Sequence, residues 1–231
     1  MKTIAIIQAR MGSSRLPGKT MSQLGTKPLI DHVLERARVP EVIDEIYLAT
    51  TTSRGDDILV SHVQSFDEVQ IYRGSEIDVR SRFTAITEES SADLIVRITS
   101  DDPFKDPFQI VKAVNLMREK DLEYICNFEP RTLPIGMDIE VFTAAALAKS
   151  NKDFDNPLDR EHVTWSMRTE NFLWESFSLE YYEPNLRLTV DLPEDFDYCS
   201  RIAKVLHNQD GDFSWQATKL AIEEERQRRL R

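Results

Sequence analysis

Short apolar runs alternate with amphipathic segments along residues 1–120. The runs are rich in Ile, Val and Leu, and they predict strands that begin at residue 4 and span residues 45–50, 69–72 and 93–99. The segments between them predict helices over residues 28–38, 55–65, 79–89 and 107–119. This alternation with short connections predicts an α/β fold, in which right-handed crossovers place helices on both faces of a mostly parallel sheet.

Residues 121–231 follow a less regular pattern. We expect strands over residues 122–126, 138–142, 174–179 and 187–190, and helices over 144–149, from 157, from 193 and over 215–231. Thr143 and Asn156 are suitable helix caps, and the helix that starts at Pro157 is expected to carry Arg160, His162 and Arg168. The last helix is highly charged, which predicts pairs four residues apart on a solvated face. No repeat or linker divides the chain, so we expect one domain over residues 1–231.

A polar loop follows the first strand, with the sequence Gln-Ala-Arg-Met-Gly-Ser-Ser-Arg-Leu-Pro-Gly-Lys over residues 8–19. Gly12 and Gly18 permit positive φ and close approach of a ligand to the backbone. Arg10, Arg15 and Lys19 supply positive charge, and free backbone N–H groups can surround an anion. The loop therefore predicts a site for a triphosphate.

Two other interpretations of this loop remain open. A P-loop has four residues between its glycine and its Gly-Lys pair, whereas five residues separate Gly12 from Gly18 here. A P-loop also opens a long helix, but residues 25–28 (Gly-Thr-Lys-Pro) interrupt this chain soon afterwards. The remaining interpretation is a solvated basic turn.

Composition narrows the class of protein. The 231 residues carry a formal net charge of −11, which argues against general binding of nucleic acid. No apolar run is long enough to span a membrane, and no signal peptide precedes the first strand. Cys126 and Cys199 lie far apart without metal-ligand spacing. We therefore expect a cytoplasmic protein with buried thiols and with no nucleic-acid or membrane partner.

Carboxylates follow two of the predicted strands. Asp101 and Asp102 come after the strand at 93–99, where Mg²⁺ is commonly held beside a phosphate loop. Neighbouring residues of an extended chain point in opposite directions, so one of the two is expected to face a metal. The alternative is that both cap the helix near Pro107. Asp191 ends the segment at 187–190, and metal binding and helix capping are equally compatible with its position.

For several other polar residues, a functional role and an ordinary structural role are both compatible with the sequence. Arg73 could contact a base or a phosphate, or could pair with a nearby carboxylate, Glu76 or Asp78. His162 could be a general base, a donor to a substrate or a histidine on a helix face, and Arg160 has the same alternatives. Two carboxylates lie two residues apart after a turn glycine, Gly136, and could bind sugar hydroxyls or be solvated; they are Asp138 and Glu140.

The loop at residues 8–19 resembles the signature loop of sugar-activating cytidylyltransferases. The closest likeness is to the spore-coat polysaccharide biosynthesis (SpsF-like) branch, and CMP-Kdo synthetases and acylneuraminate cytidylyltransferases are more distant relatives. The likeness continues in the same order through residues 72–79, 97–103, 136–142, 160–164 and 187–195. Many members of the branch carry cysteine where this chain has Asp102.

The resemblance implies a Rossmann-like nucleotidyltransferase fold that uses CTP and Mg²⁺. It implies triphosphate contacts by Arg10 and Lys19, with Asp101 and Asp191 as the metal ligands, and these four are the expected catalytic residues. Residues 1–120 would bind the nucleotide, and residues 121–231 would bind the acceptor and close the site. The expected nucleotide-binding residues are Gln8, Ala9, Arg10, Gly12, Ser13, Arg15, Lys19, Arg73, Gly74 and Ser75. The expected acceptor-binding residues are Arg131, Asp138, Glu140, Arg160 and His162.

The function that the resemblance implies is the synthesis of a CMP-sugar and pyrophosphate from CTP and an anionic sugar of the ulosonic-acid type, for surface polysaccharide or glycan. A UTP- or GTP-using enzyme of the same fold, or a nucleotide-binding module without turnover, is the alternative. Relatives of this kind are often dimers, so the resemblance also allows a homodimer.

Overall fold

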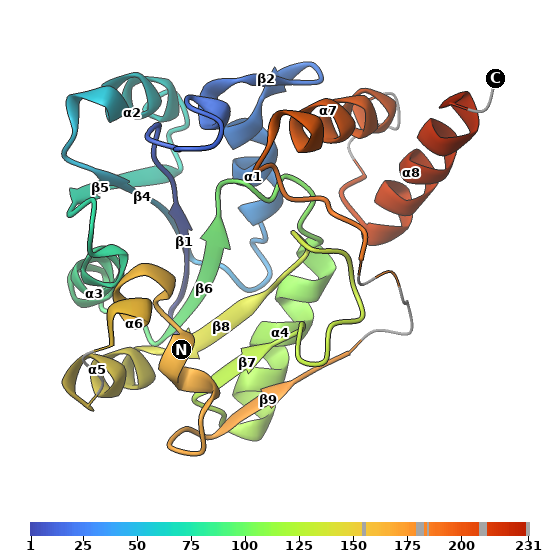
Figure 1. Ribbon diagram of the computed structural model, residues 1–231. Helices are drawn as coiled ribbons and strands as arrows, with labels where there is room; N and C mark the ends of the chain where they lie inside the picture. The colour runs from blue at the N-terminus through green and yellow to red at the C-terminus, as the bar shows by residue number, and fades with distance from the viewer. Residues whose placement is uncertain (154–155, 179–182, 184, 208–211, 230–231) are drawn as a thin grey trace.

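The computed structural model describes residues 1–153, 156–178, 183, 185–207 and 212–229. Its centre is a seven-stranded sheet in the order β5-β4-β1-β6-β8-β7-β9 (Figure 1). The parallel part contains β1 (Thr3–Gln8), β4 (Glu45–Thr51), β5 (Val69–Gly74) and β6 (Leu94–Thr99). The predicted mostly parallel sheet is confirmed, and its four predicted strands all lie in this part.

The second half of the chain extends the same sheet. Strand β8 (Glu140–Thr143) lies antiparallel between β6 and β7 (Tyr124–Cys126), and β9 (Trp174–Ser176) is parallel to β7. A small hairpin of β2 (Gln23–Leu24) and β3 (Lys27–Pro28), which the pattern did not predict, follows the basic loop.

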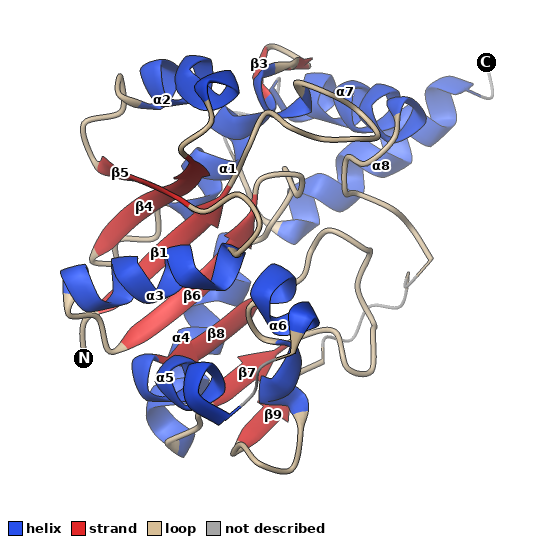
Figure 2. Ribbon diagram, turned by 60° about the vertical axis from the view of Figure 1, so that its left-hand side comes forward, coloured by secondary structure: helices blue, strands red, loops and turns tan. Residues whose placement is uncertain are grey.

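Helices cover both faces of the sheet, as predicted (Figure 2). Side chains of β1 alternate between the two cores: Ala5 and Ile7 face one, and Ile4 and Ile6 face the other. The first core contains residues of α1 (Leu29–Ala37), α2 (Asp57–Val63), α4 (Pro107–Lys120), α7 (Pro193–His207) and α8 (Trp215–Arg229). The opposite face is covered by α3 (Val79–Ser90), α5 (Ala144–Asp153) and α6 (Pro157–His162).

Local sequence determines where several helices begin. The Thr143 hydroxyl accepts a hydrogen bond from the Ala146 N–H at 3.0 Å, and the Asn156 side chain accepts from the Leu158 N–H at 2.9 Å, so both predicted caps are confirmed. Helix α4 is capped by Asp106, whose carboxylate accepts from the Phe108 N–H at 2.9 Å. The alternative in which Asp101 and Asp102 cap this helix is therefore wrong.

Two predicted elements end differently. Helix α6 stops at His162 because Val163 has a φ of 63°, so Arg168 belongs instead to a separate 3-10 turn, Trp165–Arg168. The predicted strand at 174–179 ends at Ser176, and Leu179 lies outside the described residues.

The strand predicted over 187–190 does not form. This segment makes one isolated parallel bridge, between Ile135 and Arg187. Gly136 then turns away with a φ of 101°, so the ladder cannot continue on that side. The N–H of Val190 donates instead to the carbonyl of Asp101 at 2.8 Å, which brings the 187–190 segment to the loop after β6.

The C-terminal helix combines predicted and unpredicted contacts. Arg228 pairs with Glu224 at 2.5 Å across one turn, as the charge pattern predicted. Glu225 is buried, however, and pairs with Arg201 of α7 at 2.7 Å, so part of the expected solvated face packs on the protein. Among the described residues, no helix is both long and apolar enough to cross a bilayer.

We predict that Gly136→Ala destabilises the protein by about 2–4 kcal/mol. A Cβ at this position would lie 2.6 Å from the Thr189 backbone nitrogen and 2.8 Å from the Leu188 carbonyl carbon, and φ is already positive. Urea denaturation measures the change. The control is Gly55→Ala, where the nearest atom is 3.5 Å away and we expect a change below about 1 kcal/mol. Equal effects of the two substitutions would contradict the steric argument.

Candidate active site

The basic loop after β1 folds back on itself. The Gly18 N–H donates to the Met11 carbonyl at 3.1 Å, and Gly18 has a φ of 76°, as predicted for this glycine. Gly12 does not have positive φ, so that part of the prediction is wrong. Only a three-residue 3-10 turn, Lys19–Met21, follows before the β2-β3 hairpin. The loop therefore does not open the long helix that a P-loop requires.

A buried carboxylate, Asp56, holds this loop against the end of β4. One of its oxygens accepts from the Met11 N–H at 2.7 Å, and the other accepts from the Thr50 hydroxyl at 3.1 Å and the Thr51 N–H at 3.2 Å. Burial alone would raise the pKa of Asp56, but the hydrogen bonds from Met11, Thr51 and Thr50 lower it overall. Sequence reasoning missed this residue, since an aspartate just after a strand has no local signal of its partner.

Lys19 joins the loop to both predicted metal aspartates. Its ammonium lies 3.2 Å from Asp101 Oδ2 and 3.4 Å from Asp191 Oδ1, and it donates to the Val190 carbonyl at 2.5 Å. The lysine side chain is only 10% exposed. Three segments that are distant in sequence therefore converge on one buried cation, at the carboxyl ends of β1 and β6.

The neighbours Asp101 and Asp102 have different partners, as predicted, although Asp101 lies in a turn after β6 and not on the extended backbone that the prediction assumed. Burial raises the pKa of Asp101, and the charge of Asp102 adds to this rise, while Lys19 opposes it. Asp102 accepts from the Thr99 hydroxyl at 2.6 Å and pairs with Lys105 at 3.0 Å. Burial would raise the pKa of Asp102, but Lys105 and Thr99 lower it overall.

Asp191 is held by its own segment. The carboxylate of Asp195 accepts hydrogen bonds from the N–H groups of Asp191 at 3.1 Å and Leu192 at 3.0 Å. The Asp191 side chain pairs with Arg15 at 2.8 Å and with Arg187 at 3.2 Å. Asp195 and Arg187 were not predicted as site residues. Together they fix the direction in which Asp191 points.

The two aspartates suit a divalent cation. Both present carboxylate oxygens to the same point, and Mg²⁺ typically binds one or two carboxylates together with substrate phosphates. Burial raises the pKa of Asp101 and the charge of Asp102 adds to the rise, so a cation beside Asp101 would favour its ionised form. In the part of the chain that the structure describes, no three His, Cys, Asp or Glu side chains form a metal cluster, so substrate oxygens would have to complete the coordination.

A cavity of about 230 Å³ borders the basic loop. It is lined by Arg10, Met11, Gly12, Thr51, Ser53, Gly55, Asp56 and Glu76. The Arg10 guanidinium is 47% exposed and pairs with Glu76 at 3.0 Å. A pair this exposed is weak, so Arg10 can exchange Glu76 for a phosphate at small cost.

Other expected nucleotide-binding residues have structural partners. Arg73 donates to the carbonyls of Thr51 at 2.8 Å and Ser53 at 2.7 Å, and it pairs with Asp57 at 2.7 Å rather than with the nearby carboxylates considered above. Its guanidinium therefore fixes the segment after β4, which lines the 230 Å³ cavity.

The other residues expected to bind the nucleotide also contact neighbouring parts of the protein. Ser75 accepts from the Asp78 N–H at 3.0 Å before α3, and a Cβ on Gly74 would lie 2.8 Å from Arg82. Gln8 accepts from Arg97 at 3.2 Å, and Ala9 is buried beside the β4 carbonyl of Ala49. Ser13 accepts from the Leu16 N–H at 3.2 Å.

A second cavity, of about 200 Å³, lies at the end of β6 beside Asp102. It is lined by Arg97, Thr99, Asp102, Lys105, Phe128, Asp138, Glu140, His162, Thr164, Trp165 and Arg168. Of the expected acceptor-binding residues, Asp138, Glu140 and His162 therefore come together here. Arg131 pairs with Asp138 at 2.9 Å without lining the cavity, and Arg160 is an exposed residue of α6 outside it.

Glu140 is a buried, fully engaged member of this wall rather than a solvated carboxylate. It pairs with Arg97 and accepts from the Thr164 hydroxyl and, at 2.8 Å, from the Tyr124 hydroxyl. Burial would raise its pKa, but the Arg97 charge and the hydrogen bonds lower it overall. Arg97 and Thr164 were not predicted as site residues, because their partner comes from a distant strand.

A strained turn presents His162 and Thr164 to the same cavity. The Thr164 N–H donates to the His162 carbonyl at 2.6 Å across Val163, whose φ of 63° and ψ of −49° describe a γ-turn of the rarer kind. A buried β-branched residue in this conformation costs about 1–3 kcal/mol. Packing of Val163 in the core maintains this turn between the two cavity residues.

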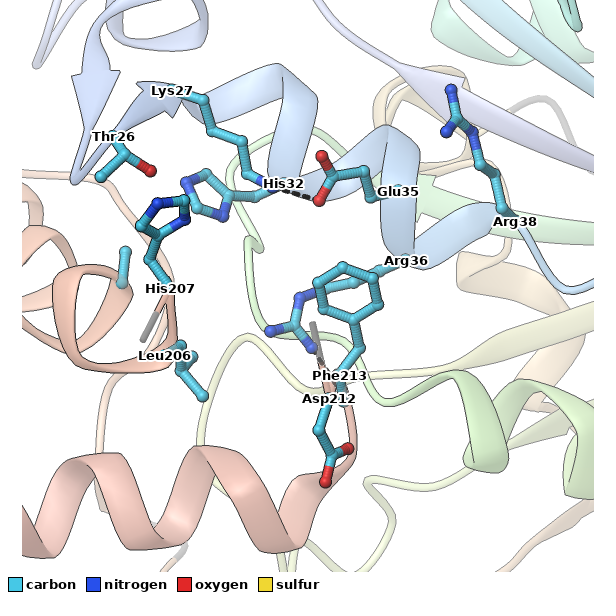
Figure 3. A pocket seen from close by; sticks show the side chains of 11 residues that line it. Thr26, Lys27, His32, Glu35, Arg36, Arg38, Leu206, His207, Asp212 and Phe213 are labelled. Atoms are coloured by element: carbon cyan, nitrogen blue, oxygen red, sulfur yellow. Dashed lines mark hydrogen bonds and ion pairs between the residues drawn. The ribbon is translucent and has the colours of Figure 1, made fainter. Parts of the chain in front are cut away.

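A third cavity, of about 510 Å³, lies away from these residues, between α1 and the end of α7 (Figure 3). The buried Arg36 forms part of its wall, and its guanidinium lies 4.9 Å from the Phe213 ring centroid. Burial lowers the pKa of His32 in the same wall to about 4, and the neighbouring cations add to this effect against the hydrogen bond to Leu24. None of the expected nucleotide, metal or acceptor residues lines this cavity.

We predict that Asp56→Asn lowers the free energy of unfolding by about 1–3 kcal/mol at pH 7. The folded pKa of Asp56 lies below its unfolded value, so its contribution is present above the unfolded pKa and is lost as pH falls through the folded pKa. The difference between the two proteins should therefore shrink below pH ~4. Urea titrations across this range measure it, and a difference independent of pH would contradict the assignment.

Comparison with known proteins agrees with this geometry. A family model described as cytidylyltransferase matches residues 4–224. The spore coat polysaccharide biosynthesis protein SpsF of Bacillus subtilis is 35% identical over 205 residues, which cover 83% of this chain and 82% of that protein. A 3-deoxy-manno-octulosonate cytidylyltransferase of Thermodesulfovibrio yellowstonii is 28% identical over 218 residues, 84% of this chain and 80% of its own length.

Solved structures give the same result. A cytidylyltransferase from Leptospira borgpetersenii superposes with a TM-score of 0.88 and 29% identity, and the match covers 98% of this chain and 96% of that one. The family model spans nearly all of the described sheet and both of the segments that contact Lys19. The chain belongs to the cytidylyltransferase family.

Proposed function

We propose that this protein transfers CMP from CTP to an acidic sugar of the ulosonic-acid class and releases pyrophosphate. One observation carries the proposal: Lys19 of the phosphate loop contacts both Asp101 and Asp191, beside a polar cavity that opens at the end of β6. A site that only bound a nucleotide would need neither a second carboxylate nor an adjoining cavity. The relatives that act on 3-deoxy-manno-octulosonate support the class of acceptor.

The chemistry is an in-line displacement at phosphorus. A hydroxyl oxygen of the sugar forms a bond to the α-phosphorus, the bond from that phosphorus to the bridging oxygen breaks, and pyrophosphate leaves with the electron pair. Such a reaction depends mainly on positioning and on neutralisation of charge. Arg10, Lys19 and the N–H groups of the loop would stabilise the charge that develops on pyrophosphate.

The carboxylates supply the other half of the site. Asp101 and Asp191 would hold Mg²⁺, which, when bound, neutralises the α-phosphate and acidifies the attacking hydroxyl. Asp195 and Arg187 keep Asp191 directed toward Lys19. Lys19 contacts both aspartates and also belongs to the basic loop, so its charge is available to both parts of the site.

Under this proposal the two halves of the chain divide the substrates. Residues 1–120 bind the nucleotide in the cavity beside the loop, and residues 121–231 supply most of the wall of the acceptor cavity and close the site. His162 and Asp138 face the acceptor, and the roles expected for Arg131 and Arg160 stay predictions. UTP or GTP in place of CTP, and binding without turnover, are the alternatives that the first experiment separates.

That experiment measures pyrophosphate release with each of the four ribonucleoside triphosphates, Mg²⁺ and a panel of ulosonic acids. We expect release with CTP and one acid, because both cavities must be filled for transfer. Release with UTP or GTP would overturn the base assignment. Binding of CTP by calorimetry with no release for any acid would overturn the acceptor class, and no CTP binding would overturn the proposal itself.

The metal ligands have a separate test. We predict that Asp101→Asn and Asp191→Asn each lower the rate of transfer by about 100-fold or more, and that Mg²⁺ no longer strengthens CTP binding. Calorimetry with and without Mg²⁺ gives the second measurement. The matched control is Asp31→Asn on α1, whose carboxylate pairs with His62 at 2.6 Å away from the site. A normal Mg²⁺ effect in both variants would exclude these aspartates as ligands.

A further inference from the structure

A buried ion pair lies in the wall of the acceptor cavity. Lys105 and Asp102 are 3.0 Å apart, their side chains are 4% and 10% exposed, and both line the 200 Å³ cavity. The sequence analysis gave Lys105 no role, and it left the role of Asp102 open. Lys105 lies four positions after Asp101, on the loop that connects β6 to α4.

The ammonium of Lys105 has one hydrogen-bond donor to spare. A lysine ammonium carries three N–H donors. One donates to Asp102 and one to the backbone carbonyl of Asp138. Among the described residues no acceptor takes the third. Since Lys105 borders the cavity, an oxygen of a ligand in that cavity can accept this hydrogen bond.

Both ends of Lys105 are held in place. Its backbone carbonyl accepts from the guanidinium of Arg36 at 3.1 Å, and Arg36 is buried against the ring of Phe104. Figure 3 shows Arg36 in the wall of the 510 Å³ cavity. At the other end, Asp102 is fixed by the Thr99 hydroxyl at 2.6 Å. The ammonium is therefore presented to the acceptor cavity in one direction.

Stability does not account for such a pair. Removing two charges from water costs several kcal/mol for each ion, and apolar residues of similar size are often as stabilising or more so. A fixed cation with a free donor in a polar cavity is, in contrast, suited to bind oxygen atoms. The pair lies next to Asp101, the expected metal ligand, and in the wall of the cavity proposed for the acceptor. The oxygen atoms that it would bind are therefore those of the sugar.

We propose that Lys105 determines acceptor specificity by donating a hydrogen bond to a carboxylate or hydroxyl oxygen of the acidic sugar, and that Asp102 is the positioning residue that aims it. This inference rests on the proposed function. It adds two residues from the first half of the chain to a pocket that the sequence assigned to the second half.

The test uses the full chain with CTP, Mg²⁺ and the acid of the panel that the wild-type protein uses. Variants are Lys105→Met, Asp102→Asn and the two together. We expect Lys105→Met and the double variant to raise the KM for the acid about tenfold or more, with the KM for CTP changed less than about twofold. Lys105→Met alone leaves the Asp102 charge buried and should also lower the Tm, whereas the double variant should regain it.

The control is the ion pair between Arg201 and Glu225, which is 2.7 Å long and joins α7 to α8 away from the cavity. Arg201→Met with Glu225→Gln should leave the KM for the acid unchanged. A double variant of Lys105 and Asp102 that is folded and keeps the wild-type KM for the acid would overturn the inference, because the pair would then be structural only.

Failure of the proposed function looks different. The wild-type protein would release no pyrophosphate with any acid of the panel, and the inference would fall with the acceptor class on which it rests. An active wild-type protein with an unchanged double variant instead removes Lys105 and Asp102 from the acceptor site and leaves the transfer reaction in place.

Discussion

The ammonium of Lys19 is the contact on which the arrangement of the site depends. It lies within 3.4 Å of two carboxylates and donates to a backbone carbonyl, so it joins the loop after β1, the loop after β6 and the segment before α7. These segments are separated by 82 and by 172 positions along the chain. Because Lys19 is buried, its loss would leave the negative charges of Asp101 and Asp191 beside each other without the cation between them. The phosphate loop and the expected metal site therefore form one electrostatic unit.

Further buried carboxylates hold the segments around Lys19 in place. Asp56 holds the backbone of the basic loop against β4, and Asp195 holds the backbone of Asp191. Glu140 contacts Arg97, Thr164 and Tyr124 in and beside the wall of the cavity proposed for the acceptor. Each accepts several hydrogen bonds, which favour its ionised form over the cost of burial. Two of these carboxylates also hold arginine side chains in place: Glu140 pairs with Arg97, and Asp195 pairs with Arg187.

Prediction from sequence succeeded where a pattern is local. Apolar runs with helical segments between them identified every strand of the parallel part of the sheet, and the Thr143 and Asn156 caps followed from residue type alone. It failed where a distant partner decides the outcome. The 187–190 segment has strand-like residues, but it forms only one β-bridge in the described residues. Gly136 turns the neighbouring chain away, and the Val190 N–H bonds to the carbonyl of Asp101 instead. The helix at 157 ended early because Val163 packs in the core with positive φ.

The sequence by itself determined the fold class, the composition of the basic loop and the position of Asp101 after a strand, because periodicity and strand-end position are properties of adjacent residues. Only the tertiary structure decided which charges meet. It paired Arg73 with Asp57, placed Asp102 on Lys105 rather than beside the expected metal, and left Arg160 outside the acceptor cavity. Ion pairs between segments depend on the direction and burial of each side chain, and these arise when helices and strands pack together.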